Sequence, residues 1–296
     1  MNGNDLLAKR FEEHRSHLRA VAYRMLGSLS EADDAVQTTW LKTAGADTGG
    51  VANLGGWLTT VASRVCLDML RSRESRREDA LDEHAAGPET RPRTDPEEEA
   101  LLADSVGLAL LVVLDRLAPT ERIAFVLHDL FAVPFADIAP IVDRSPETTQ
   151  RIASRARRRV RGDSTRGSDD RMRRYRAVEA FLRAAQHGEF EALLAMLDPD
   201  ATYRPDEAAR LLGAGTDFDG GRVLAEAFCG GARPARAIML DGEPGMVLAP
   251  GGRLRLVMTF RFAGERIAEI NAVADDDRLS RMELTVPLPE VEPARE

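Results

Sequence analysis

The sequence predicts a multidomain protein: two all-α helical domains, the second a helix-turn-helix, followed by a C-terminal α+β domain. Two segments repeat apolar residues at helical spacing, and short alternating stretches between glycine-rich turns follow beyond residue 170. A length of 296 residues suits several modules rather than one. The expected divisions are 1–77 and 101–162 for the helical domains, 78–100 and 163–170 for linkers, 171–286 for the α+β domain and 287–296 for a disordered tail.

Charge is distributed unevenly along this acidic chain. The formal net charge is −9, yet residues 144–176 carry twelve arginines against four acids, a local balance of +8. Residues 78–99 show the opposite excess, with nine acids against two arginines. Because local charge decides which surface attracts a polyanion, the basic segment predicts a nucleic-acid partner despite the negative total.

The remaining composition indicates a protein of the reducing cytoplasm. The N-terminal residues are polar, which predicts no secretory signal, and no apolar run reaches the length of roughly 20 residues that a membrane helix needs. We therefore expect no membrane partner. Cys66 and Cys229 are far apart and form neither a metal-ligand pattern nor a disulfide framework, so we expect two small buried residues, no metal and no cofactor.

The first helical domain should contain three helices. An apolar stripe runs from Phe11 to Leu26, and Ser30 with Asp33 could form the capping box of a helix that ends near Ala44. A glycine-rich interruption then predicts a loop. The pattern resumes at Trp57 and ends in the basic run 71–77, after which prolines and acids predict a solvated linker.

The second helical domain has the pattern of a helix-turn-helix. Pro119 opens one helix, and a shorter helix over 135–142 follows Pro134. A three-residue turn, 143–145, leads to a third helix with Ser145 as N-cap and Pro146 at its first position, where a missing N–H costs nothing. A short helix, a tight turn and a basic helix together predict a DNA-reading element.

The third helix of this domain has one apolar and one basic face. At 100° per residue, Thr149, Ile152, Ala156 and Val160 face the core. The alternative is a solvated basic helix in a bundle, but such helices usually contain acids, and none follows Glu147 up to Arg161. The predicted contacts to base edges are Thr148, Gln150, Arg151, Ser154 and Arg155, and those to phosphates are Arg157, Arg158, Arg159 and Arg161.

Two blocks of the sequence resemble extracytoplasmic-function (ECF) sigma factors of bacterial RNA polymerase. YRMLGSLSEADDAVQTTWLK (23–42) and GWLTTVASRVCLDMLRSRESRR (56–77) resemble their second conserved region. The segment from Leu114 to Val160 resembles their fourth region. The resemblance covers about residues 8–162 and implies a subunit that binds core RNA polymerase and promoter DNA.

The resemblance also implies a role for particular residues. Contacts to the clamp of the largest polymerase subunit fall on Asp33, Asp34, Gln37 and Lys42, although the two acids could equally be first-turn residues that complement a helix dipole. The basic helix around 145–161 would read the −35 element. The linker 78–100 would either follow cationic channels of the polymerase or act as a tether. Contacts to the −10 element fall on Asn53, Thr60, Ser63, Arg64, Arg71, Arg73, Arg76 and Arg77.

Residues 171–286 resemble the cone-shaped SnoaL-like domains, which use the fold of ketosteroid isomerases. The fold implies a pocket that could take a small-molecule ligand, but Asp206, Asp217, Asp219, Tyr203 and His187 form no convincing acid–base pair. We therefore expect no catalytic residues, no enzyme activity and an intramolecular regulator. The alternatives are a helix-turn-helix regulator with a ligand-sensing domain, and an isomerase-like enzyme fused to a DNA-binding module.

Overall fold

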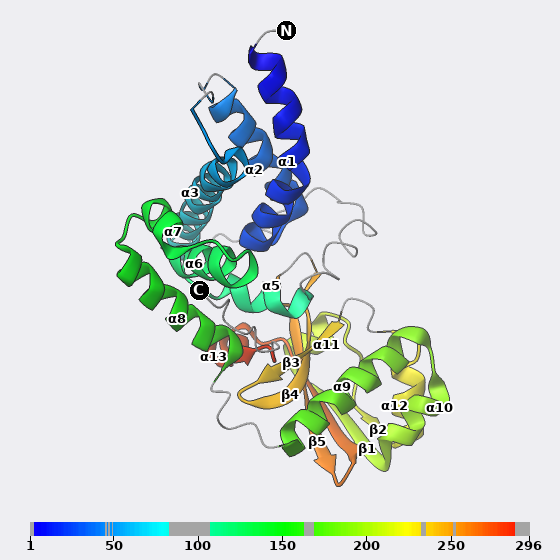
Figure 1. Ribbon diagram of the computed structural model, residues 1–296. Coiled ribbons are helices and arrows are strands. Elements are labelled where there is room, and N and C mark those ends of the chain that lie inside the picture. Colours follow the sequence, from blue (N-terminus) through cyan, green and yellow to red (C-terminus); the bar gives the residue numbers. More distant parts are fainter. Residues whose placement is uncertain are drawn as a thin grey trace. The chain divides into compact units, whose positions relative to one another are not determined.

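The computed structural model describes residues 3–44, 46, 48, 50–82, 107–162, 169–231, 235–250 and 253–287 (Figure 1). The chain forms two compact units. The first comprises residues 1–106 and 114–157, and the second comprises 107–113 and 158–296. Most of the linker 78–100, most of the linker 163–170 and the tail after Pro287 lie outside the described residues.

The first unit is helical throughout its described part, as expected. Two of its elements continue into the second unit, which takes the first six residues of α5 and the last turn of α8. The elements are α1 (Gly3–Leu26), α2 (Leu29–Thr43), α3 (Leu54–Asp82), α5 (Leu108–Asp115), α6 (Pro119–Phe125), the π-helical turn η1 (Val126–Leu130), α7 (Phe135–Val142) and α8 (Pro146–Arg161).

Helices α1, α2 and α3 pack around one apolar core (Figure 1). Phe11 and Leu18 of α1 meet Val36 of α2 and Leu58 of α3, all at most 2% exposed. Trp40 and Trp57 pack against this cluster from its edge. Burial of these side chains holds the three helices together, since each large apolar side chain contributes roughly 1.5–3 kcal/mol when removed from water.

The predicted cap of α2 is wrong by two residues. The helix begins at Leu29, and its N-cap is Ser28, whose Oγ accepts a hydrogen bond from the Glu31 amide at 3.5 Å. A capping serine needs an extended backbone, and Ser28 has it, with φ −139° and ψ 131°. Ser30 lies inside the first turn instead.

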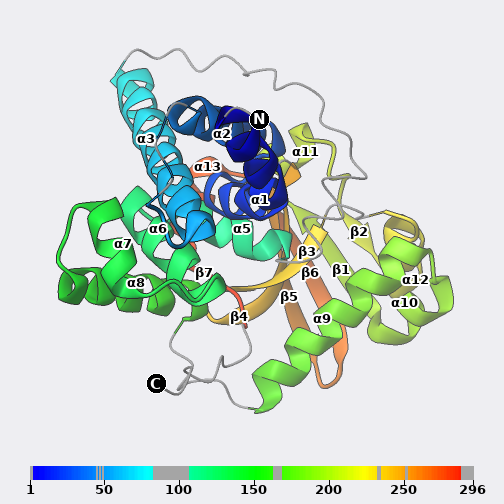
Figure 2. The ribbon, with the colours of Figure 1, turned by 45° about the horizontal axis from the view of Figure 1, so that its top comes forward.

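The helix-turn-helix of the second helical segment is confirmed. Helix α7 ends at Val142, and its cap residue Asp143 adopts the left-handed conformation with φ 56°, which lets the chain turn into α8 (Figure 2). Ser145 caps α8 as predicted, because its Oγ accepts from the Thr148 amide at 3.3 Å. The predicted helix after Pro119 is also present, but its last turn, η1, is π-helical.

The second unit contains a mixed sheet of seven strands in the order β2-β1-β6-β5-β4-β3-β7. Strands β1 and β6 are parallel and the other neighbours are antiparallel. This arrangement confirms the expected α+β class. The strands are β1 (Leu197–Pro205), β2 (Phe218–Asp219), β3 (Ala235–Leu240), β4 (Glu243–Leu248), β5 (Leu256–Ala263), β6 (Arg266–Val273) and β7 (Leu284–Thr285).

Helices cover this sheet and complete its core (Figure 1). The phenyl ring of Phe181 meets those of Phe228 and Phe260 edge-on, and Phe228 also meets Tyr203. The hydroxyl group of Tyr175 donates to the Ala237 carbonyl at 3.4 Å and ties a helix to β3. The helices are α9 (Asp169–His187), α10 (Phe190–Met196), α11 (Glu207–Leu211), α12 (Gly221–Phe228) and α13 (Asp276–Arg281).

Candidate nucleic-acid interface

Helix α8 presents a basic face to solvent, as its periodicity predicts. On the inner side, Thr149, Ala153 and Ala156 are fully buried, and the Thr149 hydroxyl donates to the Ser145 carbonyl at 2.9 Å. Ile152 is half-buried. The face that remains accessible carries four guanidinium groups and two small polar groups, from Gln150, Arg151, Ser154, Arg155, Arg158 and Arg159. The exposure of these six residues is what a contact surface for a duplex requires.

Three predicted contact residues of α8 are less exposed than expected. Thr148 is half-buried, and its hydroxyl accepts a hydrogen bond from Ser145 at 3.2 Å. Arg161 is half-buried as well. Arg157 forms an ion pair with Asp129 of η1, with Nε 2.5 Å from Oδ1. The Asp129 side chain is 7% exposed, so this arginine neutralises a nearly buried carboxylate.

The predicted polymerase-binding residues of α2 share one accessible face. Asp33, Asp34, Gln37 and Lys42 are all exposed, and Leu41 between them is 69% exposed. The opposite face of α2 is buried in the three-helix core. The Asp33 carboxylate also accepts a hydrogen bond from Arg19 of α1 at 2.7 Å, which orients it across the two helices. Charged groups surrounding an exposed leucine form a surface suited to a protein partner.

The small polar residues among the −10 candidates form hydrogen bonds with backbone groups of helix α3. Asn53 caps the helix, since its Oδ1 accepts from the Gly56 amide at 2.9 Å. The hydroxyl group of Thr60 donates to the Gly56 carbonyl at 3.0 Å. Ser63 is fully buried, and its hydroxyl donates to the Thr59 carbonyl at 2.7 Å. The structure therefore leaves Asn53 and Thr60 accessible in part but does not bring Ser63 to the surface.

The arginines among the −10 candidates fall into two groups. Arg71 and Arg76 are exposed on α3, while Arg77 lies on the same helix with its side chain outside the described part. Arg64, which is also exposed, and Arg73, which is half-buried, donate to acceptors of the protein. The Arg64 guanidinium donates to the Pro140 carbonyl of α7 at 3.2 Å, and Arg73 takes part in an ionic cluster with residues of α1, α2 and α5.

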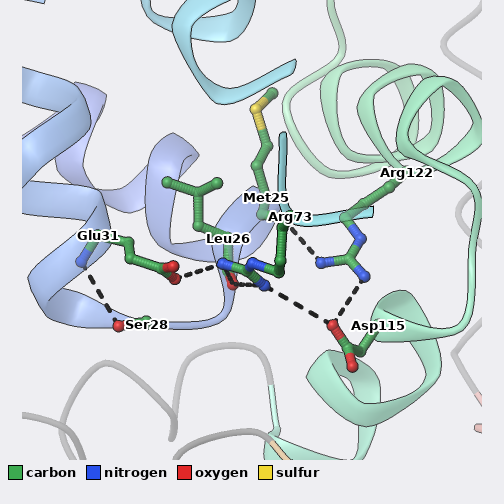
Figure 3. Close-up of polar contacts among 7 residues, drawn as sticks. All are labelled: Met25, Leu26, Ser28, Glu31, Arg73, Asp115 and Arg122. Atoms are coloured by element: carbon green, nitrogen blue, oxygen red, sulfur yellow. Dashed lines mark hydrogen bonds and ion pairs between the residues drawn. The ribbon is translucent and has the colours of Figure 1, made fainter. Parts of the chain in front are cut away.

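Figure 3 shows this cluster, in which two arginines share one carboxylate. Arg73 donates to the Leu26 carbonyl at 3.3 Å, pairs with Glu31 and lies 3.9 Å from Asp115. Arg122 of α6 also donates to the Asp115 carboxylate, at 3.0 Å. A second donor of Arg122 reaches the Met25 carbonyl at 3.1 Å. The cluster thus connects the α1–α3 bundle with the segment that carries the helix-turn-helix.

An aromatic contact joins the same two segments. The imidazole of His17 meets the ring of Phe131 edge-on, with centroids 5.5 Å apart, and Arg24 lies over the same ring at 5.0 Å. Burial, followed by the nearby His14 and Arg24, lowers the pKa of His17 from 6.5. The folded protein therefore disfavours the charged imidazolium at this position.

We expect acid to weaken this contact. Because the pKa of His17 is lower in the folded chain than in the unfolded chain, the unfolded chain binds more protons as pH falls below about 6.5, and stability decreases through that window. His17→Gln should make the free energy of unfolding of the first unit less dependent on pH between about 7 and about 5. Urea titrations at both pH values measure it, with the exposed His187→Gln as control. An unchanged pH dependence in His17→Gln would contradict the assignment.

The carboxylates predicted as possible acid–base groups in the second unit serve as structural groups. Asp206 caps α11, accepting from the Ala209 amide at 2.8 Å, and it also accepts from the amides of Ala274 and Asp275. Asp217 pairs with Arg210, and Asp219 pairs with Arg204. The hydroxyl group of Tyr203 donates to the Ala214 carbonyl at 2.6 Å, and burial raises its pKa to about 12.

Metal and thiol chemistry find little support in the described part of the chain. Within it, no three His, Cys, Asp or Glu side chains converge on a point where a metal ion could bind. Cys66 is buried, which raises the pKa of its thiol to about 12 and keeps it protonated. Cys229 is half-buried, and both cysteines are free. Across the described helices, none has the length and hydropathy of a membrane span.

Comparisons with known proteins identify two regions of this chain and its relatives. Sigma-70 region 2 matches residues 10–76, and Sigma-70 region 4 matches residues 107–160. The probable ECF RNA polymerase sigma factor SigI of Mycobacterium tuberculosis is 30% identical over 284 residues, which cover 94% of this chain and 97% of SigI. The ECF RNA polymerase sigma factor SigJ of the same organism is 40% identical over 199 residues, covering 66% of this chain and 64% of SigJ.

Among solved structures, the crystal structure of Mycobacterium tuberculosis SigJ matches with a TM-score of 0.43 and 26% identity, over 92% of this chain and 98% of that one. The similarity to SigI extends over nearly the whole of both sequences. The two sigma-70 regions occur in the order that the resemblance implied, on the α1–α3 bundle and on the helix-turn-helix segment. The chain therefore belongs to the family of ECF RNA polymerase sigma factors.

Proposed function

We propose that this sigma factor binds core RNA polymerase through α2 and reads the two promoter elements through α3 and α8. The observation that supports it most is the exposed face of α8, where Arg151, Arg155, Arg158 and Arg159 are accessible and no acid follows Glu147. Guanidinium groups near the start of such a helix pair with guanine edges, and those near its end pair with phosphates. The site would act in the cytoplasm, where polymerase and promoter meet.

We assign polymerase binding to the exposed face of α2 defined by Asp33, Asp34, Gln37 and Lys42. The clamp of the largest polymerase subunit would cover Leu41, which is otherwise an exposed leucine among charges. Charges around an apolar centre are the usual arrangement of an interface rim and core. Recognition of the −10 element is assigned to Arg71 and Arg76, and to Arg64 and Arg73 once their protein acceptors release them.

The C-terminal domain is proposed as a regulator of the DNA-reading segments rather than as an enzyme. Membership of a sigma factor family indicates a protein without a reaction of its own. The carboxylates Asp206, Asp217 and Asp219 are engaged in caps and ion pairs, which gives each of them a structural role. A small-molecule ligand of this domain stays a prediction. Covalent attachment keeps the domain at high effective concentration near its targets.

Run-off transcription with reconstituted core polymerase tests the proposal. The chain should direct initiation from a subset of genomic fragments, and Asp34→Arg should reduce core binding by inverting one exposed charge on α2. The exposed Glu13→Arg on α1, which inverts one charge in the same way, is the matched control. A chain that binds duplex operators alone, and never associates with the core enzyme, would instead be a helix-turn-helix repressor.

The base contacts of α8 should depend on the promoter sequence, and its phosphate contacts should not. Arg151→Ala should cost about 1–3 kcal/mol, or roughly 5- to 150-fold in affinity, at one promoter position only. Arg159→Ala should weaken binding to all sequences alike and reduce its salt dependence. Competition binding of the holoenzyme to promoter variants measures both. Equal losses on all sequences for both variants would refute the assignment of Arg151 to a base.

A further inference from the structure

The α1–α3 bundle and the segment 114–157 each contribute an arginine that donates to a carbonyl at a helix end of the other. The last carbonyls of a helix have no partner within it, and a cation there is also favoured by the helix dipole. At the end of α1, the Met25 carbonyl accepts from Arg122 of α6, 97 residues further along the chain. At the end of α7, the Pro140 carbonyl accepts from Arg64 of α3. Each segment therefore caps a helix of the other.

The Asp115 carboxylate connects these caps. It lies between Arg122 at 3.0 Å and Arg73 at 3.9 Å, and Arg73 itself caps α1 through the Leu26 carbonyl (Figure 3). The side chains of Arg122 and Arg73 are 5% and 18% exposed. Charges this poorly hydrated depend on their partners, so the cluster favours the arrangement in which the segments touch.

This arrangement engages two of the arginines assigned to the −10 element. Arg64 and Arg73 both contact acceptors of the other segment, Pro140 and Asp115, whereas Arg71 and Arg76 remain exposed. Helices α6 and α7 pack against α3, as both views of the chain show (Figures 1 and 2). The contact with Pro140 withdraws one donor of the exposed Arg64 guanidinium from DNA until the segments separate.

We propose that Asp115, Arg73 and Arg122 form an ionic latch that holds the −35-reading segment against α3 in the free protein. Opening of the latch frees Arg64 from the Pro140 carbonyl and removes Asp115 from Arg73, which keeps Glu31 and the Leu26 carbonyl of its own bundle. Promoter phosphates and bases therefore compete with the Pro140 carbonyl for Arg64. The proposal rests on the proposed function of α3, because the occupied arginines matter only if this helix reads DNA.

Fluorescence energy transfer within the full chain tests the latch. Labels on Ser16→Cys of α1 and Ala136→Cys of α7, both exposed sites, report the separation of the two segments in a Cys229→Ser background. Asp115→Asn removes the shared carboxylate but leaves every predicted DNA contact in place. We expect it to lower transfer and to increase the open-to-closed ratio about 3- to 10-fold, the range for a partly exposed ion pair.

The controls separate the latch from the function of α3. The exposed Asp68→Asn on α3 removes one carboxylate outside the cluster and should leave transfer unchanged. A salt titration of the unmutated sequence, which needs no folded Asp115 variant, should also lower transfer because ions screen the cluster. Transfer that stays the same in Asp115→Asn and at every salt concentration would overturn the latch.

Binding of a randomised single-stranded oligonucleotide completes the test. Asp115→Asn should bind it about 3- to 10-fold more tightly than the unmutated chain, because Arg64 is released from Pro140 and the Asp115 charge no longer lies beside Arg73. If the segments open but neither this binding nor run-off transcription is seen in any form, the proposed function of α3 fails while the latch stands. If transcription proceeds but the segments never change separation, the latch fails alone.

Discussion

Replacing Arg122 by alanine should lower the free energy of unfolding of the first unit by about 3–5 kcal/mol. The side chain is 5% exposed and donates to both Asp115 and the Met25 carbonyl. Its loss leaves a carboxylate short of one partner and a helix-end carbonyl uncapped, next to a hole the size of a guanidinium group. Removal of one partner from such a pair costs far more than the pair contributes when complete.

The two tryptophans make this measurement selective. Trp40 and Trp57 both pack against the α1–α3 core, so their fluorescence follows unfolding of the first unit and not of the sheet. The exposed Arg10→Ala on α1 removes the same charge and should change stability by less than about 0.5 kcal/mol. Equal losses in Arg10→Ala and Arg122→Ala would show that the effect is one of net charge.

Two arginines of α8 that are two residues apart should behave in opposite ways. Arg157→Ala should lower the free energy of unfolding by about 2–4 kcal/mol. The change removes the ion-pair partner of the Asp129 carboxylate, whose side chain is 7% exposed. Among the described residues, the second oxygen of Asp129 has no hydrogen-bond partner, so the acid depends on Arg157. Arg155→Ala, at an exposed site, should keep stability within about 0.5 kcal/mol and weaken promoter binding instead.

Hydrogen exchange of η1 and α8 distinguishes the two results. In Arg157→Ala the amides around the Asp129 turn should exchange faster, whereas Arg155→Ala should leave them protected. The double change Asp129→Asn with Arg157→Ala should recover part of the lost stability, because no buried charge then remains. If Arg157→Ala is stable but binds DNA weakly, Arg157 contacts phosphates, as its position on the helix predicts.

The sequence predicts which face of a helix is buried better than it predicts which side chains are occupied. Periodicity placed Thr149 and Ala156 inside and Arg151 outside, because burial follows the angle around the helix axis. It could not find the partner of Arg157, since Asp129 lies 28 residues away and only the fold brings them together. The sequence does contain one sign of such a partner: Asp129 is an isolated acid in the apolar run VLHDLF, where a buried carboxylate needs a cation.

The structure corrects the sequence prediction in three places. Ser28 and Ser30 both lie at the start of α2, and the backbone conformation at Ser28 decides which one caps it. The resemblance placed Ser63 among the −10 contacts, yet a serine can satisfy its hydroxyl within its own helix and remain buried. Helix α3 continues to Asp82, past the basic run where prolines and acids predicted a linker. Backbone conformation and burial, which a single sequence does not show, account for the first two cases.

The short strand β7 forms one edge of the sheet. Leu284 and Thr285 pair with Leu240 and Met239, the last two residues of β3, whose amides and carbonyls would otherwise be free to pair with another molecule. Truncating the chain before Leu284 should therefore promote self-association through this end of β3, visible as concentration-dependent growth in light scattering. Two paired residues would thus limit the addition of a foreign strand to the sheet.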